Sequence, residues 1–227
     1  MSQHNLPGDP SVELILRRSG RARRISLRIS QLDGRVTLTL PTGVPEREAL
    51  DFAASKSDWI RGHLAARGTD TLVDFGSQVP VAGVLREIVP GSGRRVTLAG
   101  NTICVPGTSA GPKVQAFLRN LAREKLAGAS DHYAAALGLP YARLTLRDTR
   151  SRWGSCTSQG GLMYSWRLVM ADPSVLNYVA AHEVAHLREM NHSAAFWAVV
   201  ERLYGSYKAP RSWLRTHGAS LHHYRFD

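Results

Sequence analysis

The chain contains 227 residues, of which 43% are hydrophobic and 21% are charged. This length is enough for one large domain or for two smaller lobes with a buried core. Two cysteines occur, Cys104 and Cys156, which excludes a disulfide-rich scaffold. No apolar run is long enough to span a bilayer, and residues 1–10 lack the apolar core of a signal peptide. We therefore expect a cytoplasmic protein without a membrane partner.

The formal net charge is +11, and arginine carries most of it. Such an excess favours an anionic partner, such as nucleic acid, an acidic polypeptide or a nucleotide, although a basic surface can also be simply solvated. The arginines concentrate in two groups: Arg17, Arg18, Arg21, Arg23, Arg24 and Arg28 in the first, and Arg143, Arg147, Arg150, Arg152 and Arg167 in the second.

The N-terminal half is predicted to be a β-rich lobe with one helix, over residues 12–110, preceded by a tail at residues 1–11. The Asp33-Gly34 pair predicts a hairpin turn. The helix is expected over residues 45–66, and the segment 107–112, rich in glycine and proline, is the predicted lobe boundary. The expected strands are short runs with β-type apolar patterning, at residues 12–16, 24–29, 35–40, 84–89, 95–98 and 102–105.

The second lobe, residues 111–227, is predicted to be mixed α and β. A tight segment, Ser151 to Cys156, separates its two expected strands and carries charge, an aromatic ring and a glycine. The expected strands span residues 143–147 and 162–169, and helices are expected at 112–137, 194–204 and 210–221.

Another helix carries the most informative motif of the chain. Asp172 suits an N-cap, Pro173 suits the first helical position, and apolar residues then recur at helical spacing. This helix contains His182-Glu183-Val184-Ala185-His186. Residues four apart lie on one helix face, so His182 and His186 can hold one metal ion, and Glu183 can reach a metal-bound water as a general base.

A catalytic zinc usually takes three protein ligands and keeps one position open. Glu189 lies ~10 Å of helix rise beyond His182, too far to share one ion. His192 is the preferred third ligand if the helix ends near Asn191 in a left-handed turn, with Ser193 capping the next helix. Glu201 is the alternative, which would place a carboxylate ligand on the following helix.

The remaining site assignments are less specific. The strand from Leu162 is expected to present a free edge that binds an extended peptide by strand addition. The Trp153-Gly154 turn contributes to the site or packs under the metal-binding helix; the sequence leaves both open. Candidates for binding substrate or stabilising an oxyanion are Arg152, Tyr164 and Asn191.

Several further motifs accompany the H-E-x-x-H segment: Ser151-Arg152-Trp153-Gly154-Ser155-Cys156, Trp166-Arg167-Leu168, Tyr178-Val179, Asn191-His192-Ser193 and Phe196-Trp197. Together these motifs resemble the YgjP-like metallopeptidase domain, which is related to SprT-like zinc proteases. The resemblance covers about residues 20–224. The ligand spacing equals that of metzincins, but Glu189 stands where they have glycine, which argues against a true metzincin.

The resemblance implies an α+β fold: a zincin-like catalytic half, with the active-site helix against a small antiparallel sheet, and a β-rich N-terminal half. It also implies one zinc ion per chain held by His182, His186 and His192, with Glu183 as catalytic base. We therefore expect a zinc-dependent hydrolase that cleaves peptide bonds. A metal-dependent nucleotide phosphohydrolase and a DNA-associated zinc protease or binding module are the alternatives.

Overall fold

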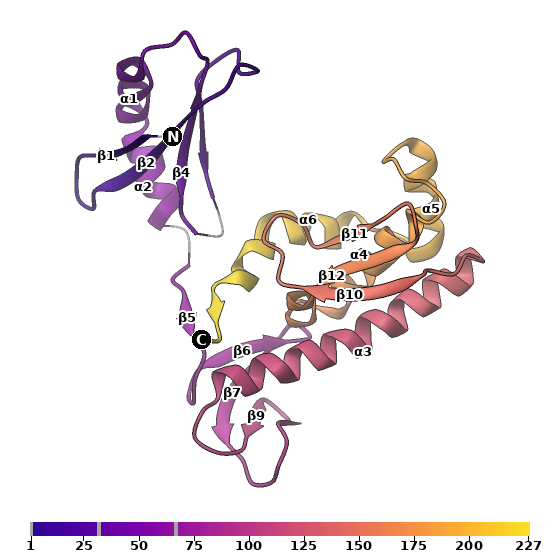
Figure 1. Ribbon diagram of the computed structural model, residues 1–227. Helices are drawn as coiled ribbons and strands as arrows, with labels where there is room; N and C mark the ends of the chain where they lie inside the picture. Colours follow the sequence, from indigo (N-terminus) through magenta and orange to yellow (C-terminus); the bar gives the residue numbers. More distant parts are fainter. Residues whose placement is uncertain (1, 31–32, 66–67) are drawn as a thin grey trace. The chain divides into compact units, whose positions relative to one another are not determined.

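The computed structural model describes residues 2–30, 33–65 and 68–227, and its chain divides into two compact units (Figure 1). The units are Met1–Thr69 and Asp70–Asp227. The division therefore lies well before the boundary predicted at residues 107–112. The reason is packing: the strands that follow residue 70 share one hydrophobic core with the long helix and the C-terminal half.

The first unit is a four-stranded sheet, in the order β1-β2-β4-β3, with two helices. A tail is predicted at residues 1–11, but the described part of it, residues 2–11, is ordered into the sheet, because β1 pairs along its whole length with β2 and buries Leu6. The predicted single helix is interrupted at Lys56, whose backbone leaves helical geometry. The elements are β1 (Ser2–Leu6), β2 (Val12–Arg18), β3 (Ser26–Ile29), β4 (Val36–Leu40), α1 (Glu46–Ser55) and α2 (Ser57–Ala65).

The second unit begins with a two-residue strand, β5 (Thr71–Leu72), and a four-stranded sheet in the order β6-β7-β9-β8. Helix α3 (Gly111–Leu137) follows as one continuous helix. The helix runs through the exposed Gly128, because the cost of one glycine, about 1 kcal/mol relative to alanine, is too small to break a long packed helix. The four strands are β6 (Gln78–Val81), β7 (Val84–Pro90), β8 (Thr97–Ala99) and β9 (Thr102–Val105).

A three-stranded sheet, in the order β10-β12-β11, lies beside the motif helix. Its strands are β10 (Arg143–Arg147), β11 (Gly154–Cys156) and β12 (Gly161–Ser165). The sheet is mixed, not antiparallel as expected, because β12 pairs parallel to β10 and antiparallel to β11. β12 is also shorter than predicted: the chain turns at Ser165 into a buried 3₁₀ helix, η1 (Trp166–Met170).

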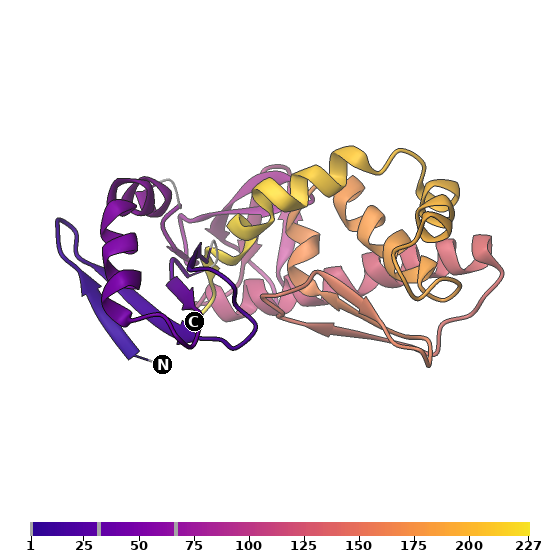
Figure 2. The same cartoon turned by 90° about the horizontal axis from the view of Figure 1, so that it is seen from above.

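The motif helix, α4 (Pro173–Ala185), packs against α3 inside the second unit (Figure 2). The predicted start is confirmed, because the Asp172 carboxylate accepts a hydrogen bond from the Ser174 N–H at 2.8 Å. The predicted end is wrong: the helix stops at Ala185, and the next residues form turns in which the Leu187 and Arg188 N–H groups bond three residues back and the Glu189 N–H bonds to the Ala185 carbonyl oxygen. α5 (Ala194–Tyr204), α6 (Lys208–His217), η2 (Gly218–His222) and β13 (Tyr224–Arg225) complete the chain.

The half-buried His222 near the C-terminus makes stability depend on pH. Burial, followed by the charge of Arg167, lowers the pKa of His222 to about 4, whereas in an unfolded chain it lies near ~6.5. The unfolded state binds more protons between these values, so stability is lost as pH falls from about 6.5 to about 4.

We expect His222→Gln to flatten this part of the pH dependence, because glutamine does not titrate. Urea unfolding at a series of pH values, with a metal chelator present, measures the slope. Equal slopes in the wild type and the variant would show that His222 does not contribute to this pH dependence.

Candidate metal centre

Three histidines from one helix and the turn after it converge on a single point. His182 lies on α4, His186 is its C-cap, and His192 lies just before α5. One ligand atom from each lies within 4.8 Å of those of the other two. The Nε2 atoms of His182 and His192 are 3.1 Å apart, close to the ~3.3 Å between two nitrogens that bind one tetrahedral zinc at ~2.05 Å.

The backbone of Glu189 orients one of these imidazoles. His186 Nδ1 is 2.9 Å from the Glu189 carbonyl oxygen, so a proton on Nδ1 is donated to that oxygen and leaves Nε2 facing the cluster. Such contacts hold metal-ligating histidines in one tautomer and orientation. Glu189 therefore acts through its carbonyl, which agrees with its exclusion as a side-chain ligand.

Aromatic rings surround the cluster and keep it in an apolar environment. Phe196 on α5 stacks on His186 at 4.4 Å between ring centroids and meets His182 edge-on at 4.9 Å. Trp197 also contacts the rings of His182 and His192.

Burial, followed by the neighbouring histidines, lowers the pKa of His182 to about 3. The pKa of His186 is also lowered, mainly by burial, so both imidazoles are neutral near pH 7, as metal binding requires.

Neutral imidazoles with converging nitrogens fit a zinc ion, whereas the alternative ligand Glu201 and the nearby Cys156 are placed differently. Glu201 is exposed on α5 and is not part of the three-histidine cluster. Cys156 on β11 lies outside the cluster as well. Burial, followed by the Glu183 carboxylate, raises the pKa of the Cys156 thiol to about 11. The thiol is therefore protonated near pH 7 and is a poor metal ligand in this state.

Glu183 is almost fully buried, at 5% exposure, and faces the backbone of the edge strand β11. A Cβ built on Gly154 would lie 2.5 Å from Glu183 Oε1 and 2.6 Å from its Cγ. Only glycine at this position gives the Glu183 side chain its space. Burial raises the pKa of Glu183 to about 8, and the Arg152 guanidinium partly offsets this shift. Sequence reasoning noted the Trp153-Gly154 turn but not this contact.

The three predicted substrate-binding residues have different surroundings. Arg152 is exposed at the entrance to β11, and its charge acts on Glu183. Tyr164 is fully buried, and its hydroxyl lies 3.0 Å from the Ser130 hydroxyl of α3. The Asn191 side-chain oxygen accepts a hydrogen bond from the Ser193 N–H at 3.0 Å. Asn191 is not in the left-handed conformation that we predicted; its side chain stabilises the turn instead.

The sheet order corrects one further expectation. The strand from Leu162 has no free edge, because β12 lies between β10 and β11; the edge nearest α4 belongs to β11. The sequence left open whether the Trp153-Gly154 turn packs against the metal-binding helix: Gly154 lies against Glu183 of α4, and the Trp153 ring lies 5.2 Å from the His222 ring. Beside His186 there is a cavity of about 420 Å³, lined by residues that include Tyr141, Leu187 and Met190.

His182 and Glu183 on α4, His186 at its C-cap and His192 just beyond it lie together beside an edge strand, an arrangement typical of H-E-x-x-H metal sites. The family model of the YgjP-like metallopeptidase domain matches residues 23–217, and the chain belongs to that family. This confirms the resemblance and the α+β fold class.

Among solved structures, the metallopeptidase zymogen of Pyrococcus abyssi, abylysin, is similar, with 19% identity and a TM-score of 0.36. The match covers 40% of this chain and 94% of that one. No curated protein matches the chain.

Gly154→Ala tests the contact between β11 and Glu183. The buried glutamate cannot keep its position against a new methyl group, so we expect a loss of about 1–3 kcal/mol in stability. Gly128→Ala is the matched control, because a Cβ on Gly128 meets nothing within 4 Å; it should stabilise α3 by about 0.4–1 kcal/mol. Urea unfolding of the metal-free proteins measures both, and a neutral Gly154→Ala would contradict the contact.

Proposed function

We propose that the protein is a zinc-dependent peptidase that binds one zinc ion per chain through His182, His186 and His192. The observation that supports this most is the convergence of three imidazoles, within 4.8 Å of one another, beside a buried glutamate on the same helix. When bound, zinc would polarise the scissile carbonyl and lower the pKa of a bound water toward ~7.

Glu183 holds and transfers the proton in this proposal. Its carboxylate lies in an apolar site against Gly154, and burial places its pKa at about 8 in the metal-free protein. A carboxyl group poised near the working pH can take a proton from water and return it to the leaving amine. The Arg152 charge favours the ionised carboxylate, which is the form that accepts the proton.

A polypeptide is the substrate that best fits the surroundings of the site. β11 is an edge strand beside α4, and an extended peptide can add to such an edge through backbone hydrogen bonds. The cavity of about 420 Å³ next to His186 can receive a substrate side chain. Arg152 lies in the loop just before β11 and is the candidate for contacting a substrate carbonyl or an oxyanion.

The nucleotide phosphohydrolase alternative requires several arginines free to bind phosphate. Arg167, a member of the second arginine group, is buried and paired with Asp148. Arg143, Arg147, Arg150 and Arg152 of the same group are exposed, so phosphate binding is not excluded by charge and the phosphohydrolase stays the alternative prediction. Binding of nucleic acid by the +11 chain stays a prediction. None of the helices in the described ranges is both long and apolar enough to cross a membrane; a cytoplasmic location also stays a prediction.

Glu183→Gln separates catalysis from metal binding. Glutamine keeps the size of the side chain but cannot act as a base, so hydrolysis of denatured protein or peptides should fall by about 10²–10⁴-fold. Zinc content, measured by elemental analysis of the same samples, should be unchanged. Near-wild-type turnover would contradict the mechanism, and loss of zinc would show that Glu183 is a ligand.

The stability of the metal-free variant is an independent check. Burial raises the folded-state pKa of Glu183 to about 8, above its unfolded value of ~4.3. The folded state then binds the extra proton, so this group costs stability increasingly as pH rises between these values. Glu183→Gln removes that cost, and metal-free Glu183→Gln should be at least as stable as the wild type at pH 8.

A further inference from the structure

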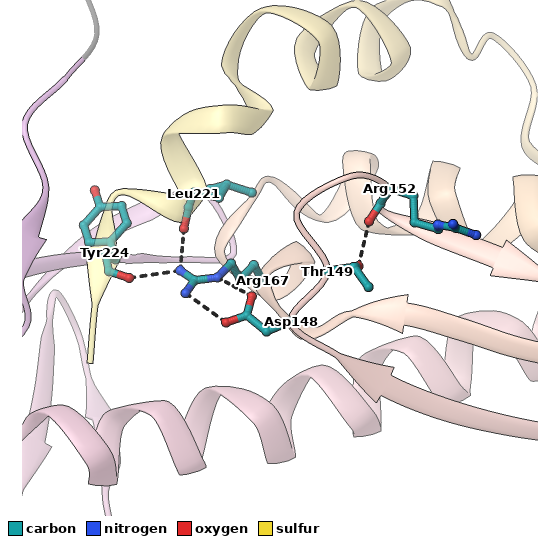
Figure 3. Close-up of polar contacts among 6 residues, drawn as sticks. All are labelled: Asp148, Thr149, Arg152, Arg167, Leu221 and Tyr224. Carbon is teal, nitrogen blue, oxygen red and sulfur yellow. Dashed lines mark hydrogen bonds and ion pairs between the residues drawn. The ribbon is translucent and has the colours of Figure 1, made fainter. Parts of the chain in front are cut away.

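Arg167 is a buried cation that the proposed chemistry does not use. It is 7% exposed and lies on η1, between β12 and α4. Its Nε and Nη2 donate to the two carboxylate oxygens of Asp148 at 2.7 and 3.1 Å. Its Nη1 donates to the carbonyl oxygens of Leu221 and Tyr224 at 2.8 and 3.0 Å (Figure 3). One guanidinium thus connects three parts of the chain: η1, which carries it, the loop that follows β10, and the C-terminal segment.

The loop that begins at Asp148 leads directly into the site. Thr149 Oγ1 donates to the Arg152 carbonyl oxygen at 2.7 Å, and the Trp153 carbonyl oxygen accepts from the Ser165 N–H at 2.8 Å. The Arg152 side chain points away from the Arg167–Asp148 pair. Gly154 comes next and packs against Glu183. Asp148 thus begins the short stretch that carries Arg152 and Gly154 to the buried glutamate.

The C-terminal segment held by Arg167 also packs on Trp153 of this loop. The ring of His222 lies 5.2 Å from the Trp153 ring. A Cβ on Gly218 would lie 2.9 Å from Trp153 Cζ2, so the backbone there approaches the indole as closely as only glycine permits. Loss of the Arg167 contacts would release the loop and the segment that packs on it together.

We propose that Arg167 and Asp148 are positioning residues, which hold the loop of residues 148–153 so that Arg152 and Gly154 lie beside Glu183. The catalytic consequence of this proposal rests on the proposed peptidase function, whereas its structural consequence does not. Buried ion pairs often contribute little net stability because desolvation offsets their attraction. A bidentate pair with two further carbonyl contacts instead fixes geometry.

Asp148→Asn tests the structural consequence. The Asp148 side chain is 40% exposed, so an asparagine can be hydrated and the variant should fold. Hydrogen exchange followed by mass spectrometry should show exchange faster by about tenfold or more in peptides covering residues 149–156 and 218–225. Peptides from α3 and β7 should change less than about twofold. Glu124→Gln, which removes the exposed ion pair with Lys125 on α3, is the matched control and should leave the loop unchanged.

Kinetics of the zinc-loaded protein test the catalytic consequence. Asp148→Asn should lower kcat/KM for a peptide by about tenfold through misplacement, with zinc content unchanged. If Asp148 acts through Arg152, then Arg152→Ala should cost much less in the Asp148→Asn background than in the wild type. A purely structural role predicts additive effects instead.

Uniform acceleration of exchange across the second unit, or additive kinetic effects, would overturn the positioning role. Absence of peptidase activity in the wild type would overturn the proposed function alone, because the exchange experiment still decides whether Arg167 and Asp148 hold the loop.

Discussion

The burial of α4 is the constraint on which the rest of the site depends. Its residues Val175, Leu176, Tyr178, Val179, Ala180, Ala181, Glu183, Val184 and Ala185 are all buried. A helix enclosed in this way presents His182 and Glu183 to an environment that disfavours charge. The same burial therefore has two results: it lowers the pKa of His182 to about 3, which keeps this imidazole neutral near pH 7, and it raises the pKa of Glu183 to about 8. An exposed helix with the same motif would have neither property.

Capping residues and helical spacing, which are local features of the sequence, predicted part of this site correctly. Asp172 and Pro173 set the start of α4, and the spacing of His182 and His186 placed both on one face; the structure agrees with each. Ser193 caps α5 as expected, with its hydroxyl accepting from the Phe196 N–H. These features depend on neighbours within a few residues, which is the range over which capping and helical periodicity operate.

Other features depend on residues far apart in the chain, and the sequence could not supply them. The order β10-β12-β11 places the edge nearest α4 on β11, a three-residue strand that has no periodic pattern. The contact between Gly154 and Glu183 joins two segments that only the fold brings together. The unit boundary before Asp70 also reflects tertiary packing, because the strands of residues 78–105 complete the core around α3.

The second arginine group shows the limit of reading function from charge. Arg152 and Arg167 are both arginines next to tryptophan, yet one is exposed beside Glu183 and the other is buried in an ion pair. Arg167 also lies over the rings of Trp166 and Phe226, so its surroundings are those of a structural residue. The net charge of the chain is consequently an upper limit on the number of positive charges that an anionic partner can contact.

The central claim is that three imidazoles hold one zinc ion and leave a position open. X-ray absorption spectroscopy at the zinc edge of the zinc-loaded protein tests it most directly. The account predicts three imidazole nitrogens at ~2.0–2.1 Å and one further light atom, with the outer-shell scattering typical of histidine rings. A sulfur at ~2.3 Å would instead place Cys156 on the metal, and only two imidazoles would remove His192 from the site; either result would contradict the account.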